Sequence, residues 1–224
     1  MKEYVIGIDE VGRGSLAGPV TVTALAIPRD FDFRMFDSDL GVYSPEIYTT
    51  LKNINSKPLL RDSKKLSPKQ RLEWVNRIRQ VPEIRFITKS VKPRVIDDIN
   101  IANAANLAAY RAIKSLTKNY LLQVANCSIY LDGGLYIKSK KYQTQNFEDA
   151  ETIIKGDELL PVVSLASIVA KVSRDKLMRR LSKIYPQYGL HVNKGYGTRD
   201  HIEAIKQHGL SEFHRLSFMK GILR

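Results

Sequence analysis

The chain has little that could crosslink it or anchor it in a membrane. It contains one cysteine, Cys127, in 224 residues, which excludes a disulfide framework and a zinc site built from cysteines. No apolar run approaches the ~18 residues that a membrane-spanning helix needs. The N-terminal Met-Lys-Glu-Tyr lacks the layout of a signal peptide. We therefore expect a soluble, cytoplasmic protein that does not associate with a membrane.

Acidic residues are scarce relative to basic ones. Asp and Glu number 23 against 36 Lys and Arg, so the net charge is +13. Residues 160–224 alone hold twelve Lys and Arg against four Asp and Glu. This excess favours a polyanionic partner such as a nucleic acid. A basic surface without any nucleic-acid partner is the alternative.

Internal repeats and low-complexity tracts are also lacking, and the length fits one domain or one domain with an appendage. Apolar and β-branched runs alternate with segments of helical periodicity, with strands early and helices late, which indicates a mixed sheet with helices packed on it. We expect strands at 4–9, 19–27, 84–90, 128–131 and 152–155, the first two forming a hairpin. We expect helices at 68–79, 100–116, 161–184 and 199–207, a weak helix at 45–52 and a polar loop at 140–150.

Two acids are followed closely by three glycines in residues 7–20, which read Gly-Ile-Asp-Glu-Val-Gly-Arg-Gly-Ser-Leu-Ala-Gly-Pro-Val. Asp9 and Glu10 end an apolar run, and a carboxylate at a strand end can ligate a hard cation such as Mg2+. The glycines let a polymer backbone approach the chain closely, and Arg13 offers a fork of donors suited to phosphate. A tight turn with solvated acids is the alternative for this pattern.

Two later aspartates have a similar context. Asp132 ends a short apolar strand, and Asp157 follows a β-like run before the long helix. Strands of one sheet can bring such ends together, and clustered carboxylates can hold two divalent ions for phosphodiester hydrolysis. Each aspartate alone could equally be a turn or cap residue. We interpret Asp97 and Asp98 as acids at a helix entry, where the helix dipole favours them.

The motif at 7–20 resembles the N-terminal signature of the ribonuclease HII family, or type 2 ribonuclease H, in its bacterial type. Similar blocks follow in the family's order at 62–67, 96–101, 164–172, 193–198, 208–210 and 214–218. The chain departs from the family in a longer link after Pro28, in an insertion at 140–150 and at Ser15, where proline is common. The resemblance implies an α/β fold with a ribonuclease H-like mixed β-sheet flanked by helices. It also implies a single catalytic domain over 1–224, in which 185–224 is a small helical extension near the substrate groove.

The resemblance assigns the metal ligands as well. The family holds its divalent ions with an Asp-Glu pair in the first motif and with two later aspartates. These match Asp9, Glu10, Asp132 and Asp157, although Glu158 is adjacent and could replace Asp157. The implied cofactor is Mg2+ or Mn2+, because oxygen ligands suit such hard ions.

An enzyme that selects RNA within DNA must sense the 2′-hydroxyl group. The resemblance assigns this to the Gly-Arg-Gly turn and to Tyr196, for which a core position is the alternative. Ser167, Lys171 and Arg174 of the predicted helix at 161–184 would contact phosphates; the alternative is that they belong to a solvated helix face. The four histidines lack ligand spacing and are assigned no catalysis, and Trp74 is expected in the core. The implied substrate-binding set is Gly12, Arg13, Gly14, Lys64, Ser167, Lys171, Arg174 and Tyr196.

These assignments predict a metal-dependent endoribonuclease. It would hydrolyse the RNA strand of RNA/DNA hybrids and nick duplex DNA 5′ of embedded ribonucleotides, as in ribonucleotide excision repair. The products would carry a 3′-hydroxyl and a 5′-phosphate, and the enzyme would be a monomer. The alternative is a non-catalytic nucleic-acid-binding protein on the same fold. It explains the charge of +13 but leaves the four acids without a use, and without metal they would weaken phosphate binding.

Overall fold

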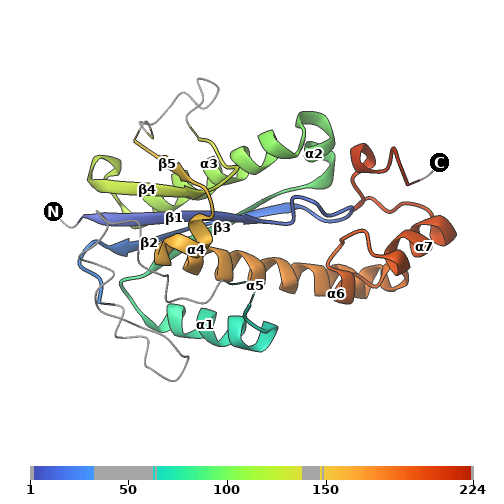
Figure 1. The fold of residues 1–224 in the computed structure, drawn as a ribbon, viewed down its shortest axis with the longest axis horizontal. Coiled ribbons are helices and arrows are strands. Elements are labelled where there is room, and N and C mark those ends of the chain that lie inside the picture. The colour runs from blue at the N-terminus through green and yellow to red at the C-terminus, as the bar shows by residue number, and fades with distance from the viewer. Residues whose placement is uncertain (1–2, 33–62, 64, 138–146, 148, 223–224) are drawn as a thin grey trace.

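The computed structural model of the chain describes residues 3–32, 63, 65–137, 147 and 149–222. These residues form an elongated α/β structure in which one sheet lies between helices (Figure 1). The elements are β1 (Tyr4–Val11), β2 (Val20–Pro28), α1 (Pro68–Gln80), β3 (Arg85–Val91), α2 (Pro93–Ile99), α3 (Ile101–Tyr120), β4 (Cys127–Asp132), β5 (Glu151–Ile153), α4 (Gly156–Leu159), α5 (Pro161–Ile184), α6 (Leu190–Asn193) and α7 (Arg199–His208). Short 3-10 helices lie at Val124–Asn126, Pro186–Tyr188 and Leu216–Phe218.

The sheet is mixed, as the sequence predicts. Its strand order is β3-β2-β1-β4-β5. β2 pairs antiparallel with β1 and with β3, which confirms the predicted hairpin. β4 pairs parallel with β1 and with β5, so these three strands end at the same edge of the sheet. That edge is where the candidate acids were expected to meet.

Residues of β1 alternate between the two faces of the sheet. Ile6 and Ile8 belong to a core cluster with α3, whereas Val5 belongs to a cluster with α1 and α5. Gly7 shares the face of Val5, and a Cβ atom there would lie 2.4 Å from the carbonyl carbon of Val162. Helix α5 therefore rests directly on β1. Because side chains alternate with a period of two, Asp9 also faces α5.

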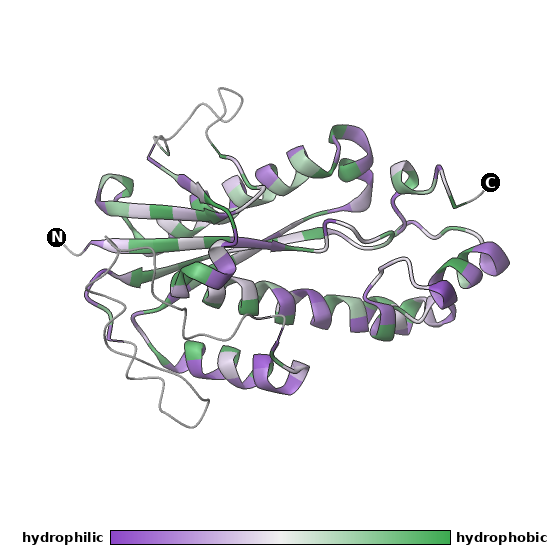
Figure 2. Cartoon of the chain, in the orientation of Figure 1, coloured by the Kyte–Doolittle hydropathy of each residue, from purple (hydrophilic) through white to green (hydrophobic). Residues whose placement is uncertain are grey.

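The two core clusters account for most of the apolar sequence pattern. Figure 2 shows apolar residues along the strands and on the inner sides of the helices, with polar residues on their outer sides. Trp74 is 6% exposed, which confirms its predicted core position. Several helices begin and end close to their predicted limits, and both ends of α5 lie at the predicted residues. α1 begins at Pro68 with a capping box between Ser67 and Gln70, as the Ser-Pro sequence predicts.

The interpretation of Asp97 and Asp98 as acids at a helix entry is wrong. Both lie inside α2, which begins at Pro93 and ends before Asn100. The Asp97 carboxylate accepts hydrogen bonds from the backbone N–H groups of Leu216 and Ser217, each at 2.9 Å. Asp97 thus ties the C-terminal segment to α2. The predicted helix at 45–52 lies outside the described residues, as does most of the predicted loop at 140–150.

The segment after α5 forms a third cluster at the far end of the molecule (Figure 1). Its helices pack on the C-terminal half of α5, through residues such as Met178 and Leu181. Leu16 and Ala17, which follow the glycine-rich turn, are buried in the same cluster. The turn after β1 therefore lies between the sheet and the C-terminal segment.

Candidate active site

Three of the predicted acids meet at the edge of the sheet. The parallel register pairs Ile8 of β1 with Leu131 of β4, so the next residues, Asp9 near the end of β1 and Asp132 at the end of β4, lie on neighbouring strands. Asp9, Glu10 and Asp132 can each offer one carboxylate oxygen such that all three lie within 4.8 Å of one another. Asp9 is 3% exposed. The strand register therefore concentrates negative charge in a largely dry site.

Burial of these acids makes their ionisation costly. It raises the pKa of Asp9 to about 7 and that of Glu10 to about 8, and it also raises the pKa of Asp132. Mutual repulsion among the carboxylates raises these pKa values further, whereas Lys171 lowers the pKa of Asp9 and Arg13 lowers that of Glu10. A cation bound among the carboxylates would remove this cost.

The fourth predicted acid, Asp157, belongs to the first turn of α4 and lies close to Asp132 and Asp9. It is 4% exposed, its backbone N–H donates to Asp132 Oδ1 at 3.3 Å, and its charge raises the pKa of both Asp9 and Asp132. Glu158 points elsewhere, because its carboxylate pairs with Lys155 at 3.5 Å and is 37% exposed. This placement favours Asp157 over Glu158 as the fourth acid.

The residues present fit a divalent metal ion. The Oε2 atom of Glu10 is buried and has no hydrogen-bond partner among the described residues, although a buried carboxylate oxygen ordinarily has one. All the donor atoms are carboxylate oxygens, which suit Mg2+ or Mn2+. The predicted cofactor thus agrees with the donor chemistry of the site.

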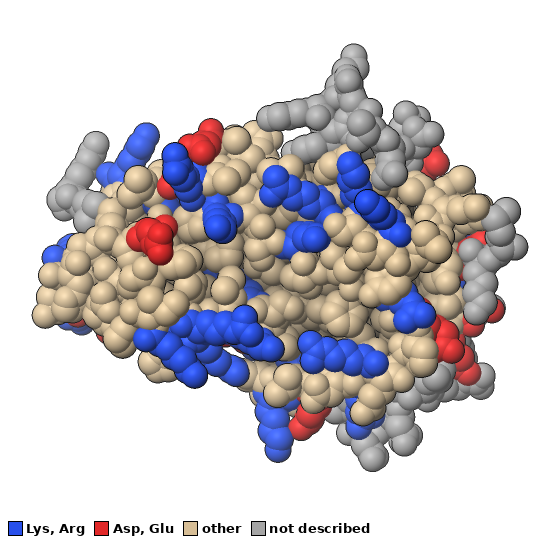
Figure 3. Space-filling model, turned by 180° about the vertical axis from the view of Figure 1, so that it is seen from behind, with Lys and Arg blue, Asp and Glu red and all other residues tan. Residues whose placement is uncertain are grey.

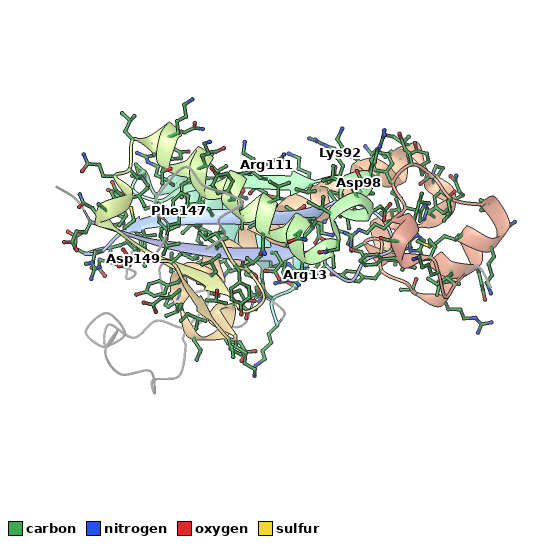
Figure 4. All side chains as sticks on the ribbon, turned by 90° about the horizontal axis from the view of Figure 1, so that it is seen from above. Arg13, Lys92, Asp98, Arg111, Phe147 and Asp149 are labelled. Carbon is green, nitrogen blue, oxygen red and sulfur yellow. The ribbon has the colours of Figure 1, made fainter. Side chains whose placement is uncertain are left out.

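Arg13 connects this cluster to the loop after β4. Its guanidinium donates from Nη1 to Glu10 Oε1 at 3.3 Å and to the carbonyl oxygen of Gly134 at 3.0 Å. In Figure 4, Arg13 lies near the middle of the long axis of the molecule. The side chain is 34% exposed, so it combines an internal contact with access to solvent.

The glycines of the turn differ in their surroundings. Gly12 is buried at φ +88°, and a Cβ atom there would lie 2.4 Å from the guanidinium carbon of Arg174. The packing of the chain itself therefore requires a glycine at position 12. Gly14 is exposed, and a Cβ atom there would meet nothing within 4 Å. Gly14 thus leaves open the close approach that the sequence predicts for a polymer backbone.

A buried arginine from the C-terminal segment orients the peptide groups of this turn. Arg215 is 0% exposed and donates to the carbonyl oxygens of Gly12 at 2.6 Å, Arg13 at 2.7 Å and Gly18 at 3.0 Å. In a trans peptide the N–H group points opposite to the carbonyl, and the described residues contain no cis peptide. The amides of Arg13 and Gly14 therefore point away from Arg215, and no described residue accepts a hydrogen bond from them. They form a pair of outward donors suited to an anionic or hydroxyl oxygen.

Arg174 does not have the surroundings of a phosphate-binding residue. Its side chain is 1% exposed, and Nη2 donates to Ser15 Oγ at 2.7 Å and to the carbonyl oxygens of Ala17 and Lys194, each at 3.1 Å. The guanidinium also binds the carbonyl of Pro19. Arg174 therefore supports the turn from within, and the expectation of a direct phosphate contact is corrected. Ser15, unusual for its position, provides one of the acceptors.

Ser167 is likewise an interior residue, at 0% exposure, which corrects its expected contact with phosphate. Its hydroxyl hydrogen-bonds to Asp9, which lowers the pKa of that carboxyl group. The Nζ atom of half-buried Lys171 donates to Ser167 Oγ at 2.6 Å and to Ser63 Oγ at 2.7 Å. These three side chains line the side of the acid cluster that faces α5. Lys64 lies outside the described residues.

Tyr196 lies on the surface, 41% exposed, so a core position for this tyrosine is excluded. The preceding residue, Gly195, accepts hydrogen bonds at its carbonyl oxygen from the amides of Leu16 at 2.7 Å and Ala17 at 3.1 Å. The segment that carries Tyr196 is thereby joined to the glycine-rich turn. The structure brings together two of the elements predicted to read the sugar.

Two contributors to this site received no role from the sequence. Arg215 and Ser63 lie in the blocks 214–218 and 62–67, which carry the family resemblance. Neither contact could be deduced from sequence spacing, because Ser63 meets residues more than one hundred positions away and Arg215 reaches the turn across two hundred. Membership of a family block was the signal that could have drawn attention to them.

Basic side chains are spread over both helical layers. Exposed cations include Arg111, Lys114 and Lys118 on α3 and Lys176, Arg179, Arg180 and Lys183 on α5. Figure 3 shows Lys and Arg gathered in two rows on the rear face, above and below a band with few charged residues. No helix in the described ranges is both long enough and apolar enough to cross a bilayer.

The chain is similar to known proteins over nearly all of its length. The family model for ribonuclease HII matches residues 6–221. A ribonuclease HII from Chlorobium luteolum is 38% identical over 96% of this chain and 88% of its own length. The crystal structure of ribonuclease H2 from Pyrococcus horikoshii OT3 superposes with a TM-score of 0.69 at 24% identity, over 98% of this chain and 97% of that one. Bst-RNase HIII in complex with Mn2+ gives a TM-score of 0.67 at 19% identity, over 99% of this chain and 70% of that one.

The two solved structures share the fold of this chain, which confirms the predicted ribonuclease H-like α/β architecture. The family model agrees with this fold over residues 6–221, and the named relative is similar over 96% of the chain. The carboxylate cluster lies where β1 and β4 run side by side, and the chain belongs to the ribonuclease HII family, whose members are metal-dependent endoribonucleases that degrade the RNA of RNA/DNA hybrids.

Proposed function

We propose that this enzyme, besides degrading RNA in hybrids, nicks duplex DNA on the 5′ side of a single embedded ribonucleotide. The cut would leave a 3′-hydroxyl and a 5′-phosphate and would open the way to removal of the ribonucleotide. The observation that carries this proposal is the position of the acid cluster beside two outward amides, those of Arg13 and Gly14. Metal-binding groups and potential sugar-binding groups thus lie next to each other in residues 9–14.

The acids have distinct tasks in this proposal. Asp9, Glu10, Asp132 and Asp157 would hold the divalent ions. A cation would replace the protons that the raised pKa values of Asp9, Glu10 and Asp132 favour. Bound Mg2+ or Mn2+ would supply activation of water and neutralise charge on the scissile phosphate. Ser167 orients Asp9 through a hydrogen bond, and both Ser167 and Lys171 favour its ionised form, because each lowers the pKa of Asp9 against the larger effect of burial.

The Gly-Arg-Gly turn and Tyr196 would select the ribonucleotide. The amides of Arg13 and Gly14 offer donors to the sugar hydroxyl or its phosphate, and Gly14 leaves room for the strand. The exposed ring of Tyr196 would lie against the sugar, because its segment is joined to the turn through Gly195. Two groups that contact the same sugar must keep a constant separation, and the hydrogen bonds to Gly195 hold the turn and Tyr196 together in this way.

A non-catalytic nucleic-acid-binding protein fits these observations less well. Clustered acids in a basic protein weaken phosphate binding unless a cation neutralises them. Burial of Asp9 and Asp157, at 3% and 4% exposure, would also cost stability without providing any function. The acid cluster therefore favours the enzyme.

The proposal is tested with a DNA duplex that contains one ribonucleotide and with a matched all-DNA duplex, each in Mg2+ or Mn2+. We expect a nick on the 5′ side of the ribonucleotide and none in the all-DNA duplex. DNA polymerase should extend the new 3′ end, and removal of the 5′-phosphate should require a phosphatase. Cleavage of RNA/DNA hybrids combined with failure on the single ribonucleotide would contradict this specificity while leaving the family activity intact.

Three further features are part of the proposal. Residues 1–224 would form one catalytic domain, in which 185–224 is a helical extension that supports the substrate groove. The hydrogen bonds from Arg215 to the turn favour this arrangement. The enzyme would act as a monomer in the cytoplasm, and size-exclusion chromatography with light scattering would test the oligomeric state.

A further inference from the structure

Two buried histidines lie behind Tyr196. His201 in α7 is 0% exposed and His214 is 2% exposed. Their Nε2 atoms are 3.2 Å apart. On the other side of each ring, His201 Nδ1 lies 2.8 Å from the carbonyl oxygen of Tyr196, and His214 Nδ1 lies 2.9 Å from the backbone nitrogen of Ser211. The rings thus form a continuous chain from the Ser211 loop to Tyr196.

The partners of these rings define a single arrangement of protons. A carbonyl oxygen can only accept, so His201 Nδ1 carries a proton and donates to Tyr196. A backbone N–H can only donate, so His214 Nδ1 carries no proton and accepts from the amide of Ser211; the Ser211 hydroxyl, also 2.9 Å from Nδ1, can then act as a second donor. Neutral His214 then has its proton on Nε2 and donates it to the bare Nε2 of His201. All four ring nitrogens are satisfied when both histidines are neutral.

A second proton on either ring would break this chain. On His201 it would place two N–H groups face to face, and on His214 it would oppose the Ser211 amide. Burial lowers the pKa of both histidines, that of His214 to about 4. The ring of Tyr188 packs edge-on against both at 6.3 and 4.7 Å. The pair is therefore held neutral and fixed in orientation.

The backbone of Tyr196 is restrained while its ring remains exposed. Its amide donates to the carbonyl of Asn193 at 2.9 Å, and its carbonyl accepts from the amide of Thr198 at 2.8 Å. These two contacts lie within the same short loop. His201 provides a side-chain contact from α7 to the Tyr196 carbonyl. Because His201 also hydrogen-bonds to His214, this contact connects Tyr196 to the segment after α7.

We propose that His201 and His214 are positioning residues for Tyr196. Their directional hydrogen-bond chain fixes the Tyr196 carbonyl and thereby the place from which the phenol ring meets the sugar of an embedded ribonucleotide. This inference rests on the proposed function, because it takes Tyr196 to be the residue that reads the sugar. It assigns a task to two histidines that have no place in the metal site.

The test compares two substitutions of His201 that differ in one hydrogen bond. His201→Asn can keep a donor near the position of Nδ1, whereas His201→Gln moves the donor toward the position of Nε2. Rates are measured on a duplex with a single ribonucleotide and on a continuous RNA/DNA hybrid, which offers many cleavage registers. We expect His201→Gln to lower kcat/KM on the single ribonucleotide by about tenfold more than on the hybrid. His201→Asn should restore most of that loss.

A double-mutant cycle with Tyr196→Ala separates positioning from general damage. His201→Gln should add no further discrimination between the two substrates when Tyr196 is already absent. An equal loss on both substrates, or an undiminished effect in the Tyr196→Ala background, overturns the proposal. If Tyr196→Ala alone leaves both rates unchanged, the assigned role of Tyr196 fails first and the histidine proposal fails with it.

The wild-type protein offers a readout independent of activity and of variant folding. Long-range proton–nitrogen correlation spectra of the histidine rings report which nitrogen carries the proton. Near neutral pH we expect the Nδ1–H tautomer for His201 and the Nε2–H tautomer for His214. Exposed His191 and His208 provide signals for comparison. Any other tautomer at His201 removes the donor to Tyr196 and contradicts the proposal.

Discussion

The carbonyl oxygen of Gly195 accepts a hydrogen bond from the amide of Leu16 at 2.7 Å. This contact joins two segments that are about 180 residues apart in sequence and that carry Tyr196 and the Gly-Arg-Gly turn. Arg174 strengthens the junction, because it donates to carbonyl oxygens on both sides of it, at Ala17 and Lys194. Both candidate sugar-reading elements are thus held in one hydrogen-bonded unit next to the acid cluster.

Asp9→Asn and Asp132→Asn should each abolish cleavage while the protein stays folded. Each substitution removes a carboxylate from a cluster whose oxygens lie within 4.8 Å, and loss of a metal ligand should lower the rate by far more than ~10²-fold. Rates at saturating Mn2+ and circular dichroism spectra provide the measurement and its folding control. Cleavage near the wild-type rate in either variant would rule out that residue as a ligand.

Asp157 and Glu158 form a matched pair for locating the fourth acid. Asp157→Ala should remove activity, because Asp157 is buried beside Asp132. Glu158→Ala should leave activity close to wild type, because Glu158 faces solvent and pairs with Lys155. Such exposed pairs contribute little to stability. Assays of both variants at saturating Mn2+ decide the matter, and the reverse result would move the fourth ligand to Glu158.

Metal and pH should have linked effects on stability through Asp9. Burial raises the pKa of Asp9 in the folded protein to about 7 from an ordinary value of 3.8. The folded state therefore binds more protons than the unfolded state between these values, so the contribution of Asp9 to stability is lost as pH rises through 7. In a chelator, Asp9→Asn should gain melting temperature relative to wild type between about pH 5 and about pH 8.

Saturating Mn2+ should reverse this order at about pH 8, because the ion binds the ionised wild-type site and stabilises the folded state by mass action. Differential scanning calorimetry of both proteins, with and without Mn2+, gives the four curves required. If the difference in melting temperature between wild type and Asp9→Asn in the chelator does not vary with pH, the pKa of Asp9 is not raised. No stabilisation of wild type by Mn2+ would contradict the metal site.

Gly12 and Gly14 should respond differently to alanine. Gly12→Ala places a methyl group 2.4 Å from the Arg174 guanidinium carbon at φ +88°, so it should destabilise the protein by more than about 1 kcal/mol. Gly14→Ala meets nothing within 4 Å and should leave the melting temperature unchanged. It should nevertheless raise KM for a ribonucleotide-containing duplex, since the methyl group occupies the space left for the strand. A normal KM for Gly14→Ala would show that the strand does not approach there.

Much of the secondary structure and of the metal site could be predicted from the sequence. The limits of α5 follow from Pro161 and from continuous helical periodicity up to Ile184, and the start of α1 follows from Ser67 and Pro68. These are local signals, because caps and proline act within one turn. The acids were identifiable for a related reason, since Asp9 and Asp132 directly follow short apolar runs and Asp157 follows another after two residues. Helix α2 was missed because Pro93 begins a helix too short to show a period.

The tertiary structure decided which polar side chains face a ligand and which face the interior. Sequence spacing places Ser167, Lys171 and Arg174 on one side of α5, but packing against β1 and the C-terminal segment buries Ser167 and Arg174. Their environment depends on elements far along the chain, which helical periodicity does not encode. The same holds for Arg215 and the histidine pair. A sequence by itself determines local conformation and supplies the reactive groups, whereas their orientation depends on contacts that form when distant segments pack together.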